Sequence, residues 1–288
     1  MPAERAGGVP GDGEVLPTAL VEDIAGWSGW QGAPWGRLRY RIVDHTLERV
    51  CRTVSGRPLR VLDAGGGDGT DAIALARRGC RVTVLDTSPV LLERARANAA
   101  AAGVADRVRT VDADLEDLTA LAALTGFRAG GSGSFDLVLC HDVLQHRPGG
   151  EARVRADIAT LVSSVRPGGC VSLLASNPAG DVMAAVVRRH DLPGALHLLD
   201  ASAAHDPVLD REVQRVSPEL AEAALVEARC SVDFRFGIRC FTDLVDDDRR
   251  KAEPGFYADL ERLELAACDR EPYLRTARSW QIVGRRRG

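Results

Sequence analysis

The sequence predicts an α/β protein built on one doubly wound, mostly parallel sheet of seven strands. Short apolar segments alternate with amphipathic segments along residues 43–175, which is typical of parallel strands joined by helices. The first apolar segment runs directly into a glycine-rich loop, as in sheets that bind a nucleotide at their edge. The 288 residues are enough to bury the core of one extended domain.

The first five strands and the helices between them follow from this alternation and from signals at the helix ends. Ser88 followed by Pro89 indicates a helix N-cap, because a serine oxygen can accept from the first free backbone N–H groups. The predicted elements are helices over 43–54, 71–78, 88–102 and 156–165, strands over 60–63, 81–86, 108–111, 135–140 and 170–175, and a turn over 166–169.

The alternation weakens past Asn177. Residues 178–216 are interpreted as an insertion on the substrate side, after the fifth strand, and residues 192–216 within it are expected to form a lid. The remaining predicted elements are helices over 183–190, 217–228 and 257–268 and strands over 232–241 and 277–283.

Two segments lack periodicity. Residues 1–17 are rich in Gly, Pro and Ala and are expected to form a flexible N-terminal tail, which leaves residues 18–288 as a single domain. Residues 127–134 contain a Gly/Ser-rich run and are expected to form a surface loop.

Composition excludes several classes of protein. No apolar run approaches the roughly 20 residues that span a bilayer, and the N-terminus lacks a signal-peptide pattern, so we expect a cytoplasmic protein without membrane contact. The seven cysteines include no C-x-x-C pair, which argues against a metal site and a disulfide framework. The net charge of −4 provides no general attraction for nucleic acid, so such a partner would need a local basic patch.

Residues 61–69, VLDAGGGDG, are the most informative stretch. The glycines permit a sharp turn and a close approach of the backbone to a ligand. A tight turn or a dehydrogenase loop would also contain glycines, but Asp63 at the strand end and the compressed Gly65-x-Gly67-x-Gly69 spacing differ from the G-x-G-x-x-G loop that binds a pyrophosphate. Here the chain resembles the class I methyltransferases, which have a Rossmann-like fold and pass this loop, including Gly66, beside the methionine part of S-adenosyl-L-methionine.

Acidic residues follow the next two strands. Asp86 ends the second strand, where a carboxylate can accept hydrogen bonds from ribose hydroxyls; its alternative role is to cap the following helix. The resemblance implies that Asp114 accepts from the adenine amine and that Leu115 adds an apolar or backbone contact, whereas a solvated acidic turn is the alternative.

Residues 140–146, CHDVLQH, follow the fourth strand at the edge where doubly wound sheets bind ligands. His141 is a candidate to contact the cofactor or acceptor, as an orienting group or a base, and His146 is a second candidate. Either histidine could instead be a satisfied structural group.

Beyond this class, the chain resembles the bacterial tRNA 5-carboxymethoxyuridine methyltransferases, which esterify a carboxylate on a modified wobble uridine. The resemblance rests on residues 22–25, 36–39, 61–69 and 141–144 and, more specifically, on residues 237–243, 263–264 and 268–273. Departures at Gln145-His146, near Gly130 and over 195–216 concern the acceptor side. The resemblance implies that the cofactor contacts are Arg39, Gly65, Gly66, Asp86, Asp114, Leu115 and His141.

The acceptor determines what the chemistry requires. A carboxylate is already ionised near neutral pH and needs orientation rather than a base, for which Arg239 or Arg270 are candidates. A small-molecule hydroxyl, amine or carbon acceptor would make a base relevant, and a non-catalytic cofactor-binding protein is a further alternative. For tRNA phosphates the candidates are Arg37, Arg41, Arg188, Arg189, Arg249, Arg250 and the arginines of 285–287, which could equally form a solvated surface.

Overall fold

The computed structural model describes residues 29–54, 58–118, 135–206 and 210–288. The predicted tail over 1–17 and the predicted loop over 127–134 lie outside these ranges. Among the described residues, no helix is long and apolar enough to cross a membrane.

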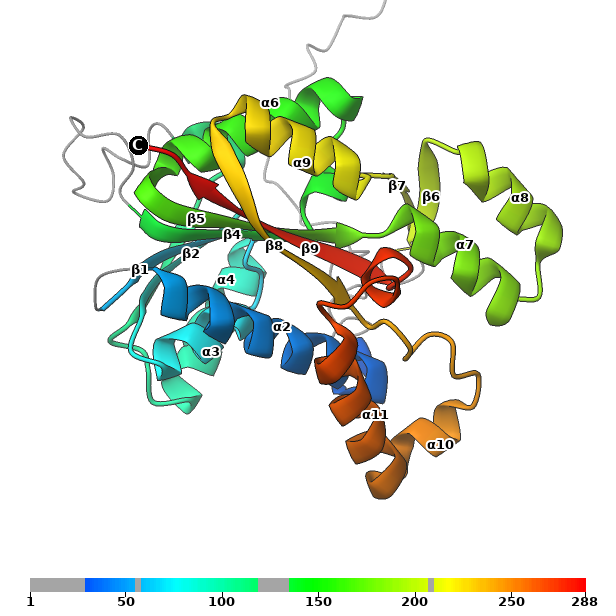
Figure 1. The fold of residues 1–288 in the computed structure, drawn as a ribbon. Helices are drawn as coiled ribbons and strands as arrows, with labels where there is room; N and C mark the ends of the chain where they lie inside the picture. Colours follow the sequence, from blue (N-terminus) through cyan, green and yellow to red (C-terminus); the bar gives the residue numbers. More distant parts are fainter. Residues whose placement is uncertain (1–28, 55–57, 119–134, 207–209) are drawn as a thin grey trace, which may run out of the picture.

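A seven-stranded sheet in the order β3-β2-β1-β4-β5-β9-β8 forms the centre of the molecule (Figure 1). β9 runs antiparallel to both of its neighbours, whereas β1 to β5 pair in parallel, so the predicted doubly wound, mostly parallel sheet is confirmed. The strands are β1 Arg60–Ala64, β2 Arg81–Asp86, β3 Val108–Asp112, β4 Phe135–His141, β5 Val165–Ser176, β8 Cys230–Ile238 and β9 Ser279–Arg286.

Helices cover both faces of the sheet, and each face has its own apolar core (Figure 1). On one face lie α2 Pro34–Thr53, α3 Thr70–Arg77 and α4 Pro89–Ala101, which bury residues such as Ile42, Leu75 and Leu92. On the other face lie α6 Gly150–Ser164 and α9 Pro218–Glu227, which bury Ile158 and Leu225. The seven cysteines are buried thiols.

Helix starts account for most differences from the predicted boundaries. α2 begins at Pro34 rather than at residue 43, and α7 (Pro178–Val187) begins at Pro178 rather than at residue 183. In both helices a proline occupies the first turn, where its missing N–H costs nothing. The predicted cap at Ser88 is confirmed, since its hydroxyl accepts from Leu91 N–H. The predicted turn over 166–169 is instead part of β5.

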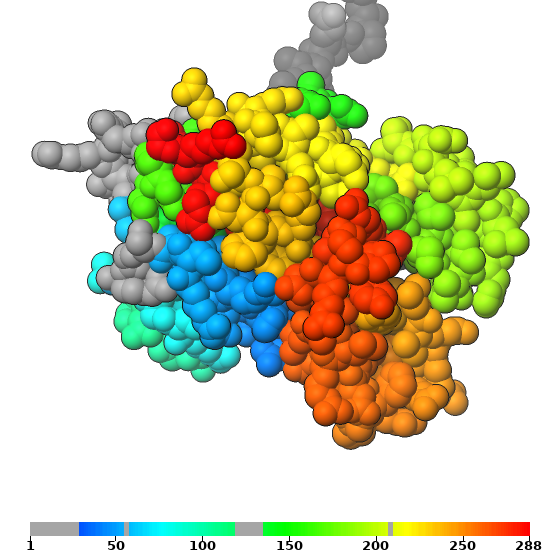
Figure 2. Space-filling model, viewed as in Figure 1, coloured from blue at the N-terminus to red at the C-terminus, as the bar shows by residue number. Residues whose placement is uncertain are grey.

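The described residues of 178–216 form two helices and two antiparallel strands that extend beyond the end of the sheet (Figures 1 and 2). Arg188 at the end of α7 connects them to the lobe of α10 and α11, since it pairs with Asp248. Residues 192–216, to which the sequence analysis assigned no helix or strand, include α8, whose N-cap is Asp191: its carboxylate accepts from Gly194 N–H. That this segment closes over a substrate stays a prediction. The elements of the two lobes are α7, α8 Leu192–Asp200, β6 Ala203–Asp206, β7 Arg211–Gln214, α10 Asp248–Ala252 and α11 Pro254–Ala267.

The strand order places a crevice at one edge of the sheet. β1 connects to β2 on one side, whereas β4 lies on its other side, so the chain changes direction between β1 and β4. Ligands of open α/β sheets bind at the carboxyl ends of the strands beside such a switch.

Candidate active site

A cavity of about 760 Å³ opens at this edge. One part, the strand-end half, is formed by residues at the ends of β1, β2 and β4 and includes Asp63, Asp86 and His141. The other part, the cationic half, comes from segments after β5. Its charged residues are Asp181, Arg188, Asp206, Arg211, Arg215, Arg239, Asp243, Lys251 and Arg278.

The glycine loop lies in the strand-end half and makes the sharp turn that the sequence predicts. Gly65, Gly67 and Gly69 have φ of 76°, 53° and 77°, in the left-handed region that favours glycine. A Cβ at Gly66 would lie 2.6 Å from the Asp63 carboxylate. A side chain at that position would therefore displace the predicted ligand-binding carboxylate.

Asp63 and Asp86 present carboxylates to the cavity from neighbouring strands. Asp63 is 3% exposed, and its Oδ2 has no hydrogen-bond partner within the described ranges. Burial, together with the nearby charge of Asp71, raises the pKa of Asp63 well above its usual value. Asp86 accepts from Gly67 N–H at 2.9 Å and from Ser88 N–H at 2.9 Å, and Ser88 rather than Asp86 is the cap of α4.

Arg39 and His141 converge on Asp71, which the sequence analysis did not single out. Arg39 Nη1 donates to both Asp71 oxygens, at 3.2 and 3.1 Å, and its Nη2 donates to Asp142 Oδ2 at 2.9 Å. His141 Nδ1 lies 2.9 Å from Asp71 Oδ2, and its Nε2 lies 2.9 Å from Ser172 Oγ. Although burial opposes it, the positive Arg39 holds the pKa of Asp71 at about 2. Since both ring nitrogens of His141 are engaged, the geometry favours orientation over proton removal.

The remaining predicted residues also line the cavity. Asp114 accepts from Glu116 N–H at 2.9 Å and from Arg147 Nη1 at 3.0 Å, and Leu115 is buried beside it. His146 is different: its buried Nδ1 has no hydrogen-bond partner among the residues described, and burial lowers its pKa. Burial thus favours a neutral imidazole at this wall, with Nε2 3.9 Å from Asp206 Oδ2.

The cationic half contains six basic side chains and three carboxylates. Arg278 pairs with Asp181, and Arg239 Nη2 lies 2.9 Å from Asp243 Oδ2. Sequence reasoning named Arg188 and Arg239 but missed the other four, since these come from separate segments and share no local pattern. The four are Arg211, Arg215, Lys251 and Arg278.

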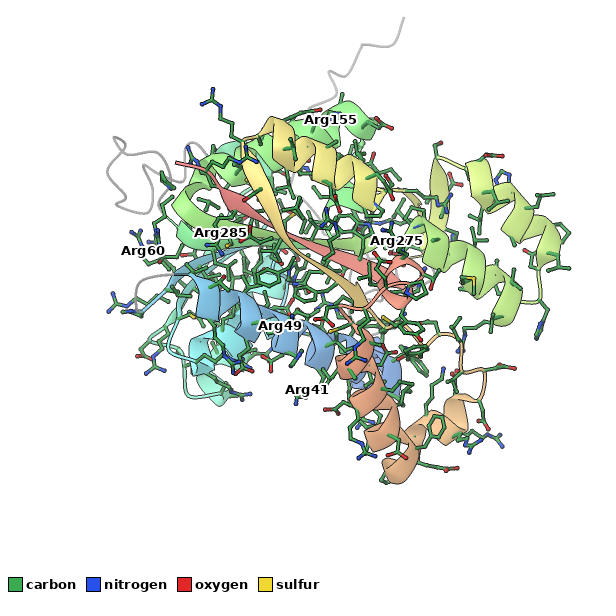
Figure 3. All side chains as sticks on the ribbon, in the orientation of Figure 1. Arg41, Arg49, Arg60, Arg155, Arg275 and Arg285 are labelled. Carbon is green, nitrogen blue, oxygen red and sulfur yellow. The ribbon has the colours of Figure 1, made fainter. Side chains whose placement is uncertain are left out.

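Several arginines named from the sequence lie elsewhere. Arg270 is exposed and does not line the cavity. Arg41, on α2, donates to Glu261 of α11 at 2.8 Å, and Arg285, on β9, pairs with Asp233 at 2.6 Å; both are labelled in Figure 3. Of the arginines predicted to contact phosphate, Arg188 is the one among the cavity-lining residues.

The known proteins that this chain resembles are methyltransferases. The methyltransferase domain family matches residues 61–169. The tRNA 5-carboxymethoxyuridine methyltransferase of Escherichia coli (strain K12) is 30% identical over 261 residues, which cover 88% of this chain and 90% of that protein. The ubiquinone biosynthesis O-methyltransferase of Xanthomonas axonopodis pv. citri is 35% identical over 142 residues, 49% of this chain and 53% of that protein.

Solved structures share the fold. A geranyl diphosphate methyltransferase in complex with SAM has a TM-score of 0.51 at 14% identity, covering 84% of this chain and 85% of that one. An S-adenosylmethionine-dependent methyltransferase from Mesorhizobium loti has a TM-score of 0.52 at 19% identity, covering 89% and 99%.

Fold, site and relatives together define an enzyme whose cofactor is S-adenosyl-L-methionine. The chain belongs to the class I S-adenosylmethionine-dependent methyltransferases. Its similarity to the tRNA 5-carboxymethoxyuridine methyltransferase of E. coli extends over nearly the whole length of both proteins.

The strand-end half fits this cofactor chemically. The unpartnered, buried Oδ2 of Asp63 suits a cationic group, and S-adenosyl-L-methionine carries both an ammonium and a sulfonium. Leu85, Leu91 and Leu115 give the neighbouring wall an apolar surface that suits a nucleoside base.

Proposed function

We propose that this methyltransferase esterifies the carboxylate of 5-carboxymethoxyuridine in tRNA. The observation that carries the proposal is the excess of basic over acidic side chains in the cationic half of a protein whose net charge is −4. Such a local concentration of arginine suits an anionic acceptor. The similarity to the E. coli tRNA enzyme supports the same acceptor, which would place the reaction in the cytoplasm.

In this proposal the strand-end half holds the cofactor. Asp63, Gly65, Gly66 and Gly67 lie beside its methionine part, and Arg39 and His141 fix the wall next to it. The proposed nucleoside contacts are Asp86 with the ribose hydroxyls, Asp114 with the adenine amine and Leu115 with the base.

The cofactor, when bound, supplies a methyl group activated by a positive sulfur. The chain then has to align an acceptor oxygen with that group and exclude competing water. Because the acceptor carboxylate is ionised near neutral pH, no side chain has to remove a proton from it. Arginines of the cationic half orient the carboxylate by charge-assisted hydrogen bonds.

A small-molecule O-, N- or C-methyltransferase is the second candidate, and His146 is the observation that favours it. His146 lines the cavity, its buried Nδ1 has no hydrogen-bond partner among the described residues, and its lowered pKa favours the neutral ring that a base for a hydroxyl or amine acceptor requires. The ubiquinone biosynthesis enzymes match only about half of this chain.

The experiment that tests the proposal is transfer of radiolabelled methyl from S-adenosyl-L-methionine to tRNA that carries 5-carboxymethoxyuridine, with unmodified tRNA as control. We expect alkali-labile label in the modified tRNA, because a methyl ester hydrolyses in base. Label only in a small-molecule extract assayed in parallel would reject the tRNA acceptor and favour the second candidate.

A further inference from the structure

Arg239 sits at the start of the connection between β8 and α10 and reaches into the cationic half of the cavity. The residue is 7% exposed, its Nη2 donates to Asp243, its guanidinium carbon lies 5.8 Å from the centre of the Trp30 ring, and its Nη1 has no hydrogen-bond partner within the described part of the chain. Its backbone has φ of 64°, a left-handed conformation that is unfavourable for a side chain of this size. The surrounding structure must therefore hold Arg239 in place.

Glu264 of α11 supplies that support from behind the cavity wall. It is 0% exposed and does not line the cavity. Its carboxylate accepts from the N–H groups of Cys240 at 2.6 Å, Phe241 at 3.0 Å and Thr242 at 2.7 Å, and from Thr242 Oγ1 at 2.5 Å. Four donors on one buried carboxylate fix the three residues that directly follow Arg239.

A second arginine lies at the same wall. Arg278 N–H donates to the Arg239 carbonyl at 3.0 Å, and the Arg278 side chain pairs with Asp181. Each guanidinium thus has one carboxylate, but Arg239 alone of these two keeps a buried nitrogen without a hydrogen-bond partner in the described residues. An incoming carboxylate would satisfy that nitrogen.

We propose that Arg239 is the specificity-determining residue that binds the acceptor carboxylate, and that Glu264 is a positioning residue that sets the direction of Arg239. This inference rests on the proposed function, because it assigns the carboxylate of that acceptor to a particular side chain. The alternative is that these residues only stabilise the fold. In that case Arg239 and Asp243 form an internal ion pair, Glu264 attaches α11 to the segment after β8, and the enzyme shows no preference for the charge of the acceptor.

The first test uses binding of the nucleoside 5-carboxymethoxyuridine and of its neutral carboxamide to the enzyme loaded with S-adenosylhomocysteine, followed by calorimetry. We expect the wild type to prefer the carboxylate by about 10- to 100-fold, as for a charge-assisted hydrogen bond, and Arg239→Gln to lose this preference. Arg239→Lys should keep part of it, because the charge remains and the fork is lost. Equal discrimination by wild type and Arg239→Gln overturns the assignment.

The second test measures the acceptor KM, kcat and cofactor affinity of Glu264→Gln, in the wild-type and the Arg239→Gln background. We expect the acceptor KM to rise about 10-fold in the wild type and not to rise further in the Arg239→Gln background, since the two residues act through one contact. Glu261→Gln, on the same helix and paired with Arg41 at the surface, is the matched control and should leave KM unchanged.

Glu264→Asp provides a second variant that keeps the charge but shortens its reach, and we expect a smaller rise in the acceptor KM with an unchanged cofactor affinity. An equal loss of cofactor affinity, or additive effects in the double variant, overturns the positioning role. If the wild type transfers no methyl to the modified tRNA, the proposed function fails; if it transfers methyl and Arg239→Gln keeps the wild-type KM, this inference alone fails.

Discussion

The two halves of the cavity are built in different ways. The strand-end half consists of strand ends and the loops that follow them. Each of its residues therefore lies at or near the end of a strand that the local sequence predicts, such as Asp63 at the end of β1 and Asp86 at the end of β2. The cationic half is assembled from segments between residues 181 and 278, which meet only in the folded chain.

Their electrostatics also differ. In the strand-end half, Oδ2 of the buried Asp63 has no hydrogen-bond partner among the described residues, whereas in the cationic half Arg278 pairs with Asp181 and Arg239 with Asp243. The strand-end half thus offers an unpaired buried carboxylate oxygen to a cationic ligand, whereas the cationic half contains arginines that are already in ion pairs. Substitutions should therefore affect cofactor binding and acceptor binding separately.

The largest expected effect comes from breaking the Arg39–Asp71 ion pair of the strand-end half. Asp71→Asn leaves the buried Arg39 with one ion-pair partner among the described residues, Asp142, and should lower the free energy of unfolding by about 3 kcal/mol in urea. Because the pKa of Asp71 is lowered to about 2, its contribution is present above the unfolded pKa of about 4 and is lost as the pH falls towards 2.

The matched control for Asp71 is Glu48→Ala, which removes an exposed partner of Arg52 and should cost less than about 1 kcal/mol. Equal losses in the two variants would show that Asp71 is not a structural centre of this half.

The next effect concerns the cofactor alone. Asp86→Ala should weaken binding of S-adenosyl-L-methionine by about 1 to 3 kcal/mol, measured by calorimetry, through lost hydrogen bonds to the ribose. Asp112→Ala, an exposed carboxylate at the end of the neighbouring strand, serves as control. Unchanged affinity in a folded Asp86→Ala protein would remove Asp86 from the cofactor site.

Asp63→Asn should separate stability from binding. Because the folded pKa of Asp63 is raised, the wild type loses stability relative to the variant as the pH rises above about 4, where the carboxyl ionises in the unfolded chain. We expect a higher thermal midpoint for Asp63→Asn at neutral pH and roughly tenfold weaker cofactor binding. A midpoint difference that does not change between pH 3 and pH 7 would contradict the first part.

The smallest effect should appear at the rim of the cationic half. Arg188 pairs with Asp248 at 3.0 Å and is partly exposed, so Arg188→Gln should raise the KM for tRNA about threefold at low salt and reduce its salt dependence by one charge. Arg155→Gln, on α6 and outside the cavity lining (Figure 3), should change neither. If the KM for tRNA has the same salt dependence in the wild type, Arg188→Gln and Arg155→Gln, then Arg188 does not contact the tRNA.

The difference between the halves also explains what the sequence could predict. The residues of 61–69 and Asp86 are readable because each follows a buried strand directly, and the sheet order then brings them together. Asp71 was missed, although it stands two residues after Gly69, because its partners Arg39 and His141 lie 32 and 70 residues away along the chain. Nothing in the local pattern around Asp71 announces those contacts.

Element boundaries failed where capping signals were left unused. Asn177 followed by Pro178 contains the same start signal as Ser88 followed by Pro89, and the side-chain oxygen Oδ1 of Asn177 accepts from Ala179 N–H at the start of α7. In the cationic half, correct helix and strand boundaries would still not have predicted which residues line the cavity. Arg278 and Asp181, for example, form an ion pair but lie 97 residues apart in the sequence.

Because β9 runs antiparallel to β8, the segment that connects these two strands has its ends side by side. Ile238 at the end of β8 is paired with Ser279 at the start of β9, so the chain leaves the sheet and re-enters it one strand away. The segment between the two strands, residues 239–278, contains Arg239, Glu264 and Arg278. The entropic cost of closing a loop whose ends adjoin in this way depends only weakly on its length. Replacing this segment would therefore change Arg239, Asp243, Lys251 and Arg278 of the cationic half while the strands of the strand-end half remain as they are.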